Sequence, residues 1–202
     1  THALGEQFEA TILEATGASS LMVVEMIQEL WSGYGKILRL SLAGGNRETV
    51  VIKHVSIPFE SRHPRGWNSN FSHKRKVFSY QVETEWYRQW STRCDEHCRI
   101  PKFLAFDRDV DNVLVVLEDL DSVGYPARLS SLSISQIRNC LTWLAEFHAT
   151  FLGEKPEGLW ETGTYWHLTT RPEELEALDD ASLKAAASKI DETLSAATVS
   201  YT

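Results

Sequence analysis

The stretch "ETVVIKHV", residues 48–55, decides the fold because it places a lysine inside a run of β-branched apolar residues. Such a run is typical of a buried strand. An unpaired ammonium group is costly to bury, so Lys53 is either an edge residue that faces water or the partner of an acidic side chain. The residues around this strand decide between the two.

Further β-prone runs lie on both sides of this stretch. "LMVVEMIQEL" (21–30) and "KILRLSL" (36–42) precede it, and "WSGYG" (31–35) and "AGGNRE" (43–48) supply the turns. "IPKFLAFD" (100–107) and "NVLVVLEDL" (112–120) follow, around the turn "DRDVD". The sequence predicts a five-stranded antiparallel sheet whose first three strands form a meander.

Apolar residues at helical spacing predict four helices. We expect a short opening helix over 3–16, ended by Gly17, and a helix over 77–93 inserted after the third strand. The apolar face of the second helix consists of Phe78, Val82, Trp86 with Tyr87, and Trp90.

A third helix is expected within 131–152, with Ser133 or Ser135 as its cap, and a last one over 181–197. The third carries the apolar stripe Ile137, Leu141, Leu144, Phe147 or His148, and Phe151.

Composition narrows the class of protein. The chain has 202 residues, is 43% hydrophobic and carries a net charge of −8 with a pI near 5.4. An acidic chain argues against a nucleic-acid partner. It has three cysteines and neither a secretory signal nor an apolar run of the roughly 18 residues that a membrane span needs. We expect a soluble, cytoplasmic protein without a membrane partner; its oligomeric state is not indicated.

The helix after the third strand offers two glutamates to Lys53. Glu83 and Glu85 are two residues apart, about 200° around the helix axis, so only one can face the sheet. Glu83 lies beside Val82 and four residues before Tyr87, near the apolar face. We therefore predict that Lys53 pairs with Glu83.

A lysine held by a glutamate in this arrangement is typical of kinase phosphoryl transfer, where the lysine contacts the α- and β-phosphates of ATP. Gly33 and Gly35, in the turn between the first two strands, would let the backbone approach and cover the phosphates. The backbone of Glu118 and Leu120, at the end of the fifth strand, would bind adenine.

Together, "WSGYG", "VVIKHV", "SYQVETEWYRQW", "LVVLEDL" and "WLAEFHATF" resemble the aminoglycoside phosphotransferase and choline kinase-like superfamily, closest to its ecdysteroid kinase-like branch. The resemblance covers roughly residues 20–170. It implies an α+β, protein kinase-like, two-lobed fold, with an N-lobe over 1–120 and the beginning of a helical C-lobe over 121–202. It also implies an ATP- and Mg²⁺-dependent phosphotransferase that acts on a hydroxyl of a small molecule.

That family continues with a His-Gly-Asp catalytic loop, a metal-binding Asn and a later metal-binding Asp, which have no counterpart in these residues. Because the chain stops at the β-prone "TVSYT", we expect a fragment of a longer polypeptide. Lys53 and Glu83 are then the catalytic residues present, no metal ligand is expected here, and transfer requires the intact protein. The rival hypothesis is a complete, non-catalytic nucleotide-binding or interaction module, similar to a pseudokinase.

Other motifs fit known sites poorly. "WSGYGK" has Leu30 and Ile37 where a Walker loop needs Gly and Ser or Thr. "DRDVDNVLVVLE" (107–118) has acidic residues at calcium-loop spacing but Asn112 in place of the required Gly, so a hairpin turn is favoured. "CDEHC" (94–98) could supply three zinc ligands, but no second Cys/His pair completes a site. A structural calcium or zinc protein is a third hypothesis.

Three features have two readings. The basic loop 58–76 is either a solvated insertion or a segment that helps to hold phosphate or an acidic substrate near the nucleotide. His148 lies on an apolar stripe, which favours a core or interlobe histidine over a catalytic one. Trp67 and Trp160 fall in loop contexts and could line a pocket.

Overall fold

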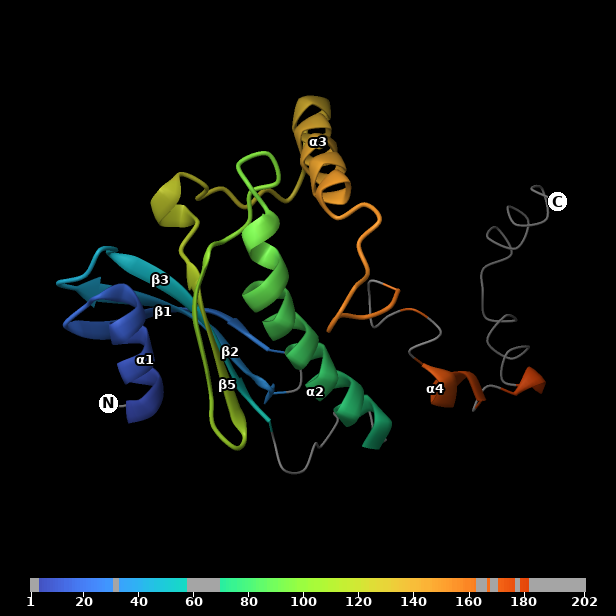
Figure 1. The fold of residues 1–202 in the computed structure, drawn as a ribbon, viewed down its shortest axis with the longest axis horizontal. Coiled ribbons are helices and arrows are strands. Elements are labelled where there is room, and N and C mark those ends of the chain that lie inside the picture. The colour runs from blue at the N-terminus through green and yellow to red at the C-terminus, as the bar shows by residue number, and fades with distance from the viewer. Residues whose placement is uncertain are drawn as a thin grey trace. The chain divides into compact units, whose positions relative to one another are not determined.

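A single antiparallel sheet organises the chain. In the computed structural model, which describes residues 4–30, 33–57, 70–162, 167, 171–176 and 179–181, the sheet has the strand order β1-β2-β3-β5-β4 (Figure 1). The strands are β1 (Ser20–Glu29), β2 (Gly35–Ala43), β3 (Thr49–Ser56), β4 (Phe103–Arg108) and β5 (Asn112–Glu118). The predicted five-stranded sheet and its opening meander are confirmed, and β3, which carries Lys53, is the central strand.

One face of the sheet is closed by helix α1 (Glu6–Thr16). Phe8 and Ile12 of α1 are buried in a core with alternate residues of the three central strands, namely Leu38, Leu40, Leu42, Val50, Ile52, Leu114 and Val116. The helix is shorter than the predicted 3–16, and Gly17 ends it with φ 65°, as expected of a left-handed C-cap. Because side chains alternate along a strand, Lys53 belongs to the opposite face.

Helix α2 (Asn70–Glu85) follows β3, as predicted, but its bounds differ. It begins seven residues before the expected Val77, because the "HKRK" run consists largely of good helix formers that the loop interpretation discounted. After Glu85 the chain continues as a π-helical turn (Trp86–Trp90) and a 3₁₀ turn (Ser91–Arg93).

The apolar face predicted for α2 is also partly wrong. Phe78 is 42% exposed, whereas Tyr80 and Thr84 are buried. The face toward the sheet is therefore built on a tyrosine, with its hydroxyl, rather than on a purely apolar stripe.

The π-helical turn directs two tryptophans at helix α3 (Ile134–Thr150). The ring of Trp86 lies 5.5 Å from Phe147 and 5.2 Å from Phe151, and Trp90 lies 6.1 Å from Phe151. The cap of α3 is Ser133, which forms a capping box with Gln136, so the first of the two predicted caps is the one used.

The remaining apolar positions of α3 are exposed. Ile137, Leu141 and Leu144 are 44%, 58% and 40% exposed. His148 is exposed as well, so the expected core histidine does not occur in the described part of the chain.

The chain divides into two compact units, 1–159 and 160–202. In the second unit the structure describes one short helix, α4 (Pro172–Glu176), in a segment where the sequence predicted none. The helix expected over 181–197 and the closing "TVSYT" lie outside the described residues, apart from residue 181, and the lobe boundary after residue 120 stays a prediction. No described helix has the length and hydropathy that crossing a bilayer requires.

Candidate functional site

The centre of the candidate site is an ion pair between β3 and α2. Nζ of Lys53 lies 2.5 Å from Oε2 of Glu83, and the two side chains are 17% and 34% exposed. The structure thus brings together the two residues that the sequence paired. Lys53 is neither an edge lysine nor a fully buried one, since it lies on the central strand and its side chain is 17% exposed.

Two tyrosines, Tyr80 of α2 and Tyr87 of the π-helical turn, lie near this pair. Nζ of Lys53 lies 5.1 Å from the ring centroid of Tyr80, a cation–π contact. Tyr87 is one turn beyond Glu83; burial and the Glu83 charge together raise the pKa of Tyr87 to about 12. Tyr87 also stacks on Phe103 of β4 with ring centroids 6.4 Å apart, which fixes α2 against the sheet.

Apolar side chains surround Lys53 on its face of the sheet. Ile37 of β2 and Val115 of β5 are its register partners. The next row toward the end of β5 holds Val51 and Leu117. Partners across an antiparallel sheet share a face, so these four apolar side chains, the apolar strip, lie on the same face as Lys53, together with Arg39, the register partner of Val51.

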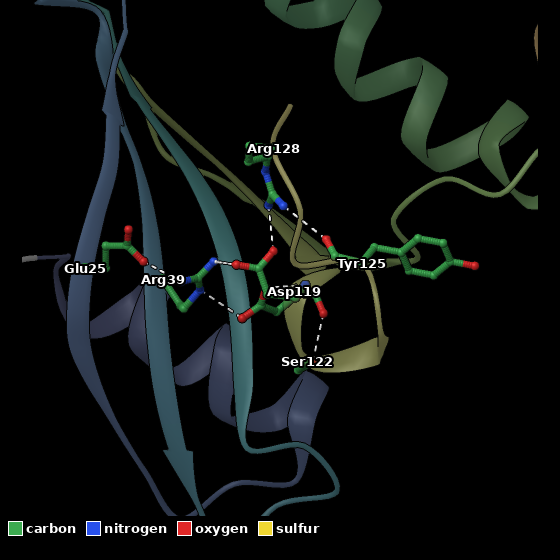
Figure 2. A network of polar contacts seen from close by, with 7 residues as sticks. Glu25, Arg39, Asp119, Ser122, Tyr125 and Arg128 are labelled. Carbon is green, nitrogen blue, oxygen red and sulfur yellow. Dashed lines mark hydrogen bonds and ion pairs between the residues drawn. The ribbon is translucent and has the colours of Figure 1, made fainter. Parts of the chain in front are cut away.

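A charged network ends the strip where β5 stops (Figure 2). Arg39 of β2 forms ion pairs with three carboxylates: Glu25, its register partner on β1, Asp119, and Asp121. Nη2 of Arg39 lies 2.5 Å from Asp121, and Nε lies 2.9 Å from Asp119, although this N–H is not directed well enough for a hydrogen bond. Arg128 adds a second cation, 2.7 Å from Asp121.

The backbone proposed for adenine lies in this segment and is already engaged. The N–H of Glu118 donates to the carbonyl of Lys102 at 2.9 Å. The carbonyl of Leu120 accepts from the N–H groups of Val123 and Tyr125, at 3.2 and 2.9 Å. A base bound here would use other groups of the segment or displace these bonds, so adenine binding by Glu118 and Leu120 stays a prediction.

The side chain of Glu118 has a structural environment. It is 4% exposed and is paired with Arg99 at 2.6 Å and with Arg47 at 3.6 Å. Burial alone raises the pKa of this carboxyl, but the Arg99 hydrogen bond, the Lys102 N–H and the arginine charges outweigh it and lower the pKa below its usual value.

The glycine turn lies at the other end of the strip. Gly33 has φ 74° and its N–H donates to the carbonyl of Leu30, within the turn. Gly35 has φ 134°, and a Cβ there would lie 2.0 Å from the carbonyl oxygen of His54. Glycine at 35 is therefore required by the close approach of β3, whereas covering phosphates stays a prediction for both residues.

Several residues of the site were missed by the sequence interpretation. Arg39 and Asp119 end the apolar strip, and Tyr34 and Lys76 lie where the glycine turn meets α2. The signal for Lys76 was the basic segment before Val77, one reading of which was phosphate binding. No local pattern pointed to Arg39, because its partners lie on β1 and after β5.

The segments considered for calcium (107–118) and zinc (94–98) have ordinary local structure. Asp109 accepts hydrogen bonds from the backbone of Asp111 and Asn112, which makes the predicted hairpin turn. Cys98 is buried and His97 is exposed. Among the residues that the structure describes, no group of three His, Cys, Asp or Glu could hold a metal ion. Trp67 and residues 58–69 of the basic loop lie outside the described residues.

These features define a class. A five-stranded antiparallel sheet with a helix inserted after its third strand, and a lysine of that strand paired with a glutamate of that helix, is a kinase-like N-lobe.

No family model matches the sequence, and no curated protein matches it. Among solved structures, WbdD in its co-crystal structure with the kinase inhibitor LY294002 is similar at 11% identity and a TM-score of 0.26. The match covers 56% of this chain and 31% of the WbdD chain, and so faint a likeness carries no weight beside the geometry described above.

Proposed function

We propose that this chain is the nucleotide-binding part of an ATP- and Mg²⁺-dependent phosphotransferase that acts on a hydroxyl of a small molecule. In this proposal it belongs to the aminoglycoside phosphotransferase and choline kinase-like superfamily, in or near the ecdysteroid kinase-like branch. The observation that carries the proposal is the Lys53–Glu83 pair, formed between β3 and α2 in a kinase-like N-lobe.

The layout of the face supports a nucleotide as ligand. Along the strands, the row of Val51 and Leu117 at the end of β5 comes first, then the row of Lys53, then the row of Gly35 and Val55 at the glycine turn, with about 7 Å between successive rows. A nucleotide presents its parts in the same order, a flat base followed by phosphates. In this arrangement the base lies against Val51 and Leu117, and Lys53 donates to the inner phosphates.

The roles of the pair follow from their contacts. Glu83 holds the ammonium group of Lys53 in place, so the lysine is oriented before the nucleotide arrives. Charge-assisted hydrogen bonds from Lys53 then fix the inner phosphates. Mg²⁺ would neutralise phosphate charge when bound, but its ligands have no counterpart among the described residues, and no step is assigned to it.

A second candidate is a non-catalytic nucleotide-binding or interaction module. The two candidates share the nucleotide site and differ in whether phosphate is transferred.

The test measures the binding of Mg-ATP to the full gene product, with thermal shift and calorimetry as the two readouts. We expect Mg-ATP to stabilise the native protein, and Lys53→Ala and Glu83→Ala to lose that stabilisation. The matched control is Lys36→Ala, which removes an exposed lysine from the neighbouring strand β2. If the native protein and Lys53→Ala respond equally to Mg-ATP, the pair is structural and the proposed function is wrong.

If Mg-ATP binds, transfer to added hydroxyl compounds distinguishes the two candidates. Release of ADP that depends on an acceptor supports the phosphotransferase. Binding without turnover over a broad acceptor panel supports the module.

A further inference from the structure

A second lysine, Lys76 of α2, reaches the glycine turn. Its Nζ lies 5.3 Å from the ring centroid of Tyr34, the residue between Gly33 and Gly35. Tyr34 is buried, 3% exposed, and packs with Leu30, Val55 and Tyr80. Lys76 is thus held at the end of the site where the turn, β3 and α2 meet.

Lys76 and Lys53 belong to one cluster. Tyr80 contacts Lys53 and lies 6.1 Å from Tyr34, and Tyr34 in turn contacts Lys76. Burial, and next the charge of Lys53, lower the pKa of Lys76, so the two ammonium groups are near enough to repel each other.

The cluster has a surplus of positive charge. Glu83 pairs with Lys53. Over the described residues, no carboxylate is within ion-pair distance of Lys76. Among the described residues, Lys53 has a carboxylate partner and Lys76 has none, so an added anion would stabilise the cluster by relieving the repulsion of the two cations and accepting their hydrogen bonds.

The orientation of Lys76 is set by neighbouring aromatic groups. The hydroxyl of Tyr34 lies 2.7 Å from Nδ1 of His73, one turn before Lys76 on the same helix, and the two rings are 5.9 Å apart. These contacts fix the Tyr34 ring, and the ring in turn fixes the ammonium group above it. An oriented lysine loses little conformational entropy when it binds an anion.

We propose that Lys76 binds the outermost phosphate of ATP, beyond the phosphates that Lys53 holds. The inference rests on the proposed function and extends it, since it adds a ligand contact at the glycine turn. The inference is based on the order of features along the face of the sheet. The end expected to hold the base comes first, then Lys53, and then the glycine turn, where Tyr34 and Lys76 lie.

The experiment measures dissociation constants of ATP, ADP and AMP for the full gene product by calorimetry, at one salt concentration. Lys76→Gln is expected to weaken ATP binding about tenfold, the effect of losing one charge-assisted hydrogen bond, and to leave AMP within about twofold. Lys76→Arg keeps the charge and is expected to retain most of the affinity for ATP. The matched control is Lys74→Gln, which removes the same charge from an exposed position of the same helix.

Each other outcome overturns the inference in a recognisable way. Equal weakening of ATP and AMP by Lys76→Gln would make Lys76 a purely structural residue. If Lys76→Gln and Lys74→Gln weakened ATP binding equally, Lys76 would contribute only through the net charge of the protein. In both cases the proposed function stands if Lys53→Ala still abolishes ATP binding, whereas a native protein that binds none of the three nucleotides refutes both proposals.

Discussion

The two ends of the candidate site lie on one face of the sheet but differ in charge: carboxylates outnumber cations at one end, and cations outnumber carboxylates at the other. At the end of β5, two cations meet three carboxylates, and the residues are Arg39, Arg128, Glu25, Asp119 and Asp121. Toward the glycine turn, two cations, Lys53 and Lys76, lie near one carboxylate, Glu83, which pairs with Lys53.

We interpret this difference as that between a structural network and a candidate binding site. Where every cation has carboxylate partners, the charges hold strands and segments together and leave little for a ligand. Where cations exceed carboxylates, the surplus is available to an anion. The side of the site that the sequence marked with a single lysine is thus the side where we propose that an anion binds, and the predictions below test the structural side.

The largest effect is expected for Arg39→Met. The change leaves Asp119, 3% exposed, without its cation, and breaking a buried pair in this way costs about 3 kcal/mol. Urea unfolding should show a lower free energy of unfolding, while Arg138→Met, at an exposed position of α3, should show little change. Equal stabilities of the two variants would contradict a structural role for the network.

A smaller, pH-dependent effect is expected for Glu118→Gln. Its folded-state pKa is lowered, so the carboxylate contributes stability above its unfolded pKa of about 4.3, and that contribution is lost as pH falls through the folded value. The variant should be less stable than the native protein by about 2 kcal/mol at pH 7, with the difference shrinking below about pH 5.

Unfolding in urea across pH 3–8 measures this difference. The control is Glu48→Gln, a carboxylate exposed in the turn between β2 and β3. A stability difference for Glu118→Gln that stays constant down to pH 3 would show that the charge of Glu118 is not the source of its contribution.

The smallest effect is expected for Arg128→Met. This side chain is 65% exposed, and an exposed ion pair contributes about 0–1 kcal/mol. The free energy of unfolding should change by less than about 1 kcal/mol and the change should vanish in 1 M salt. A loss as large as that for Arg39→Met would mean that Arg128 is an integral member of the network.

Local patterns were sufficient to predict the sheet and the central pair. Alternation and turn residues define β1 to β5, and the 200° separation of Glu83 and Glu85 selects the partner of Lys53. The cap of α3 was narrowed to Ser133 or Ser135, and the structure uses Ser133, which forms a capping box with Gln136.

Features set by distant partners were not predictable in this way. Arg39 selects Glu25, Asp119 and Asp121 from 28 acidic residues, and no spacing along the chain encodes that choice. The π-helical turn at Trp86–Trp90 is adopted where α2 ends beside α3, and its aromatic contacts are visible only in three dimensions.

The close approach of the β3 backbone to Gly35 limits what the "WSGYG" motif indicates when it is found in other sequences. A side chain at 35 would collide with the β3 backbone at His54, so a hairpin of this geometry demands glycine whether or not a nucleotide binds. A glycine aligned at 35 is thus diagnostic of strand spacing alone. If Lys76 binds phosphate as proposed, information about a ligand resides instead in Tyr34 and in Lys76, two turns before Glu83, and a search for distant homologues should weight these positions.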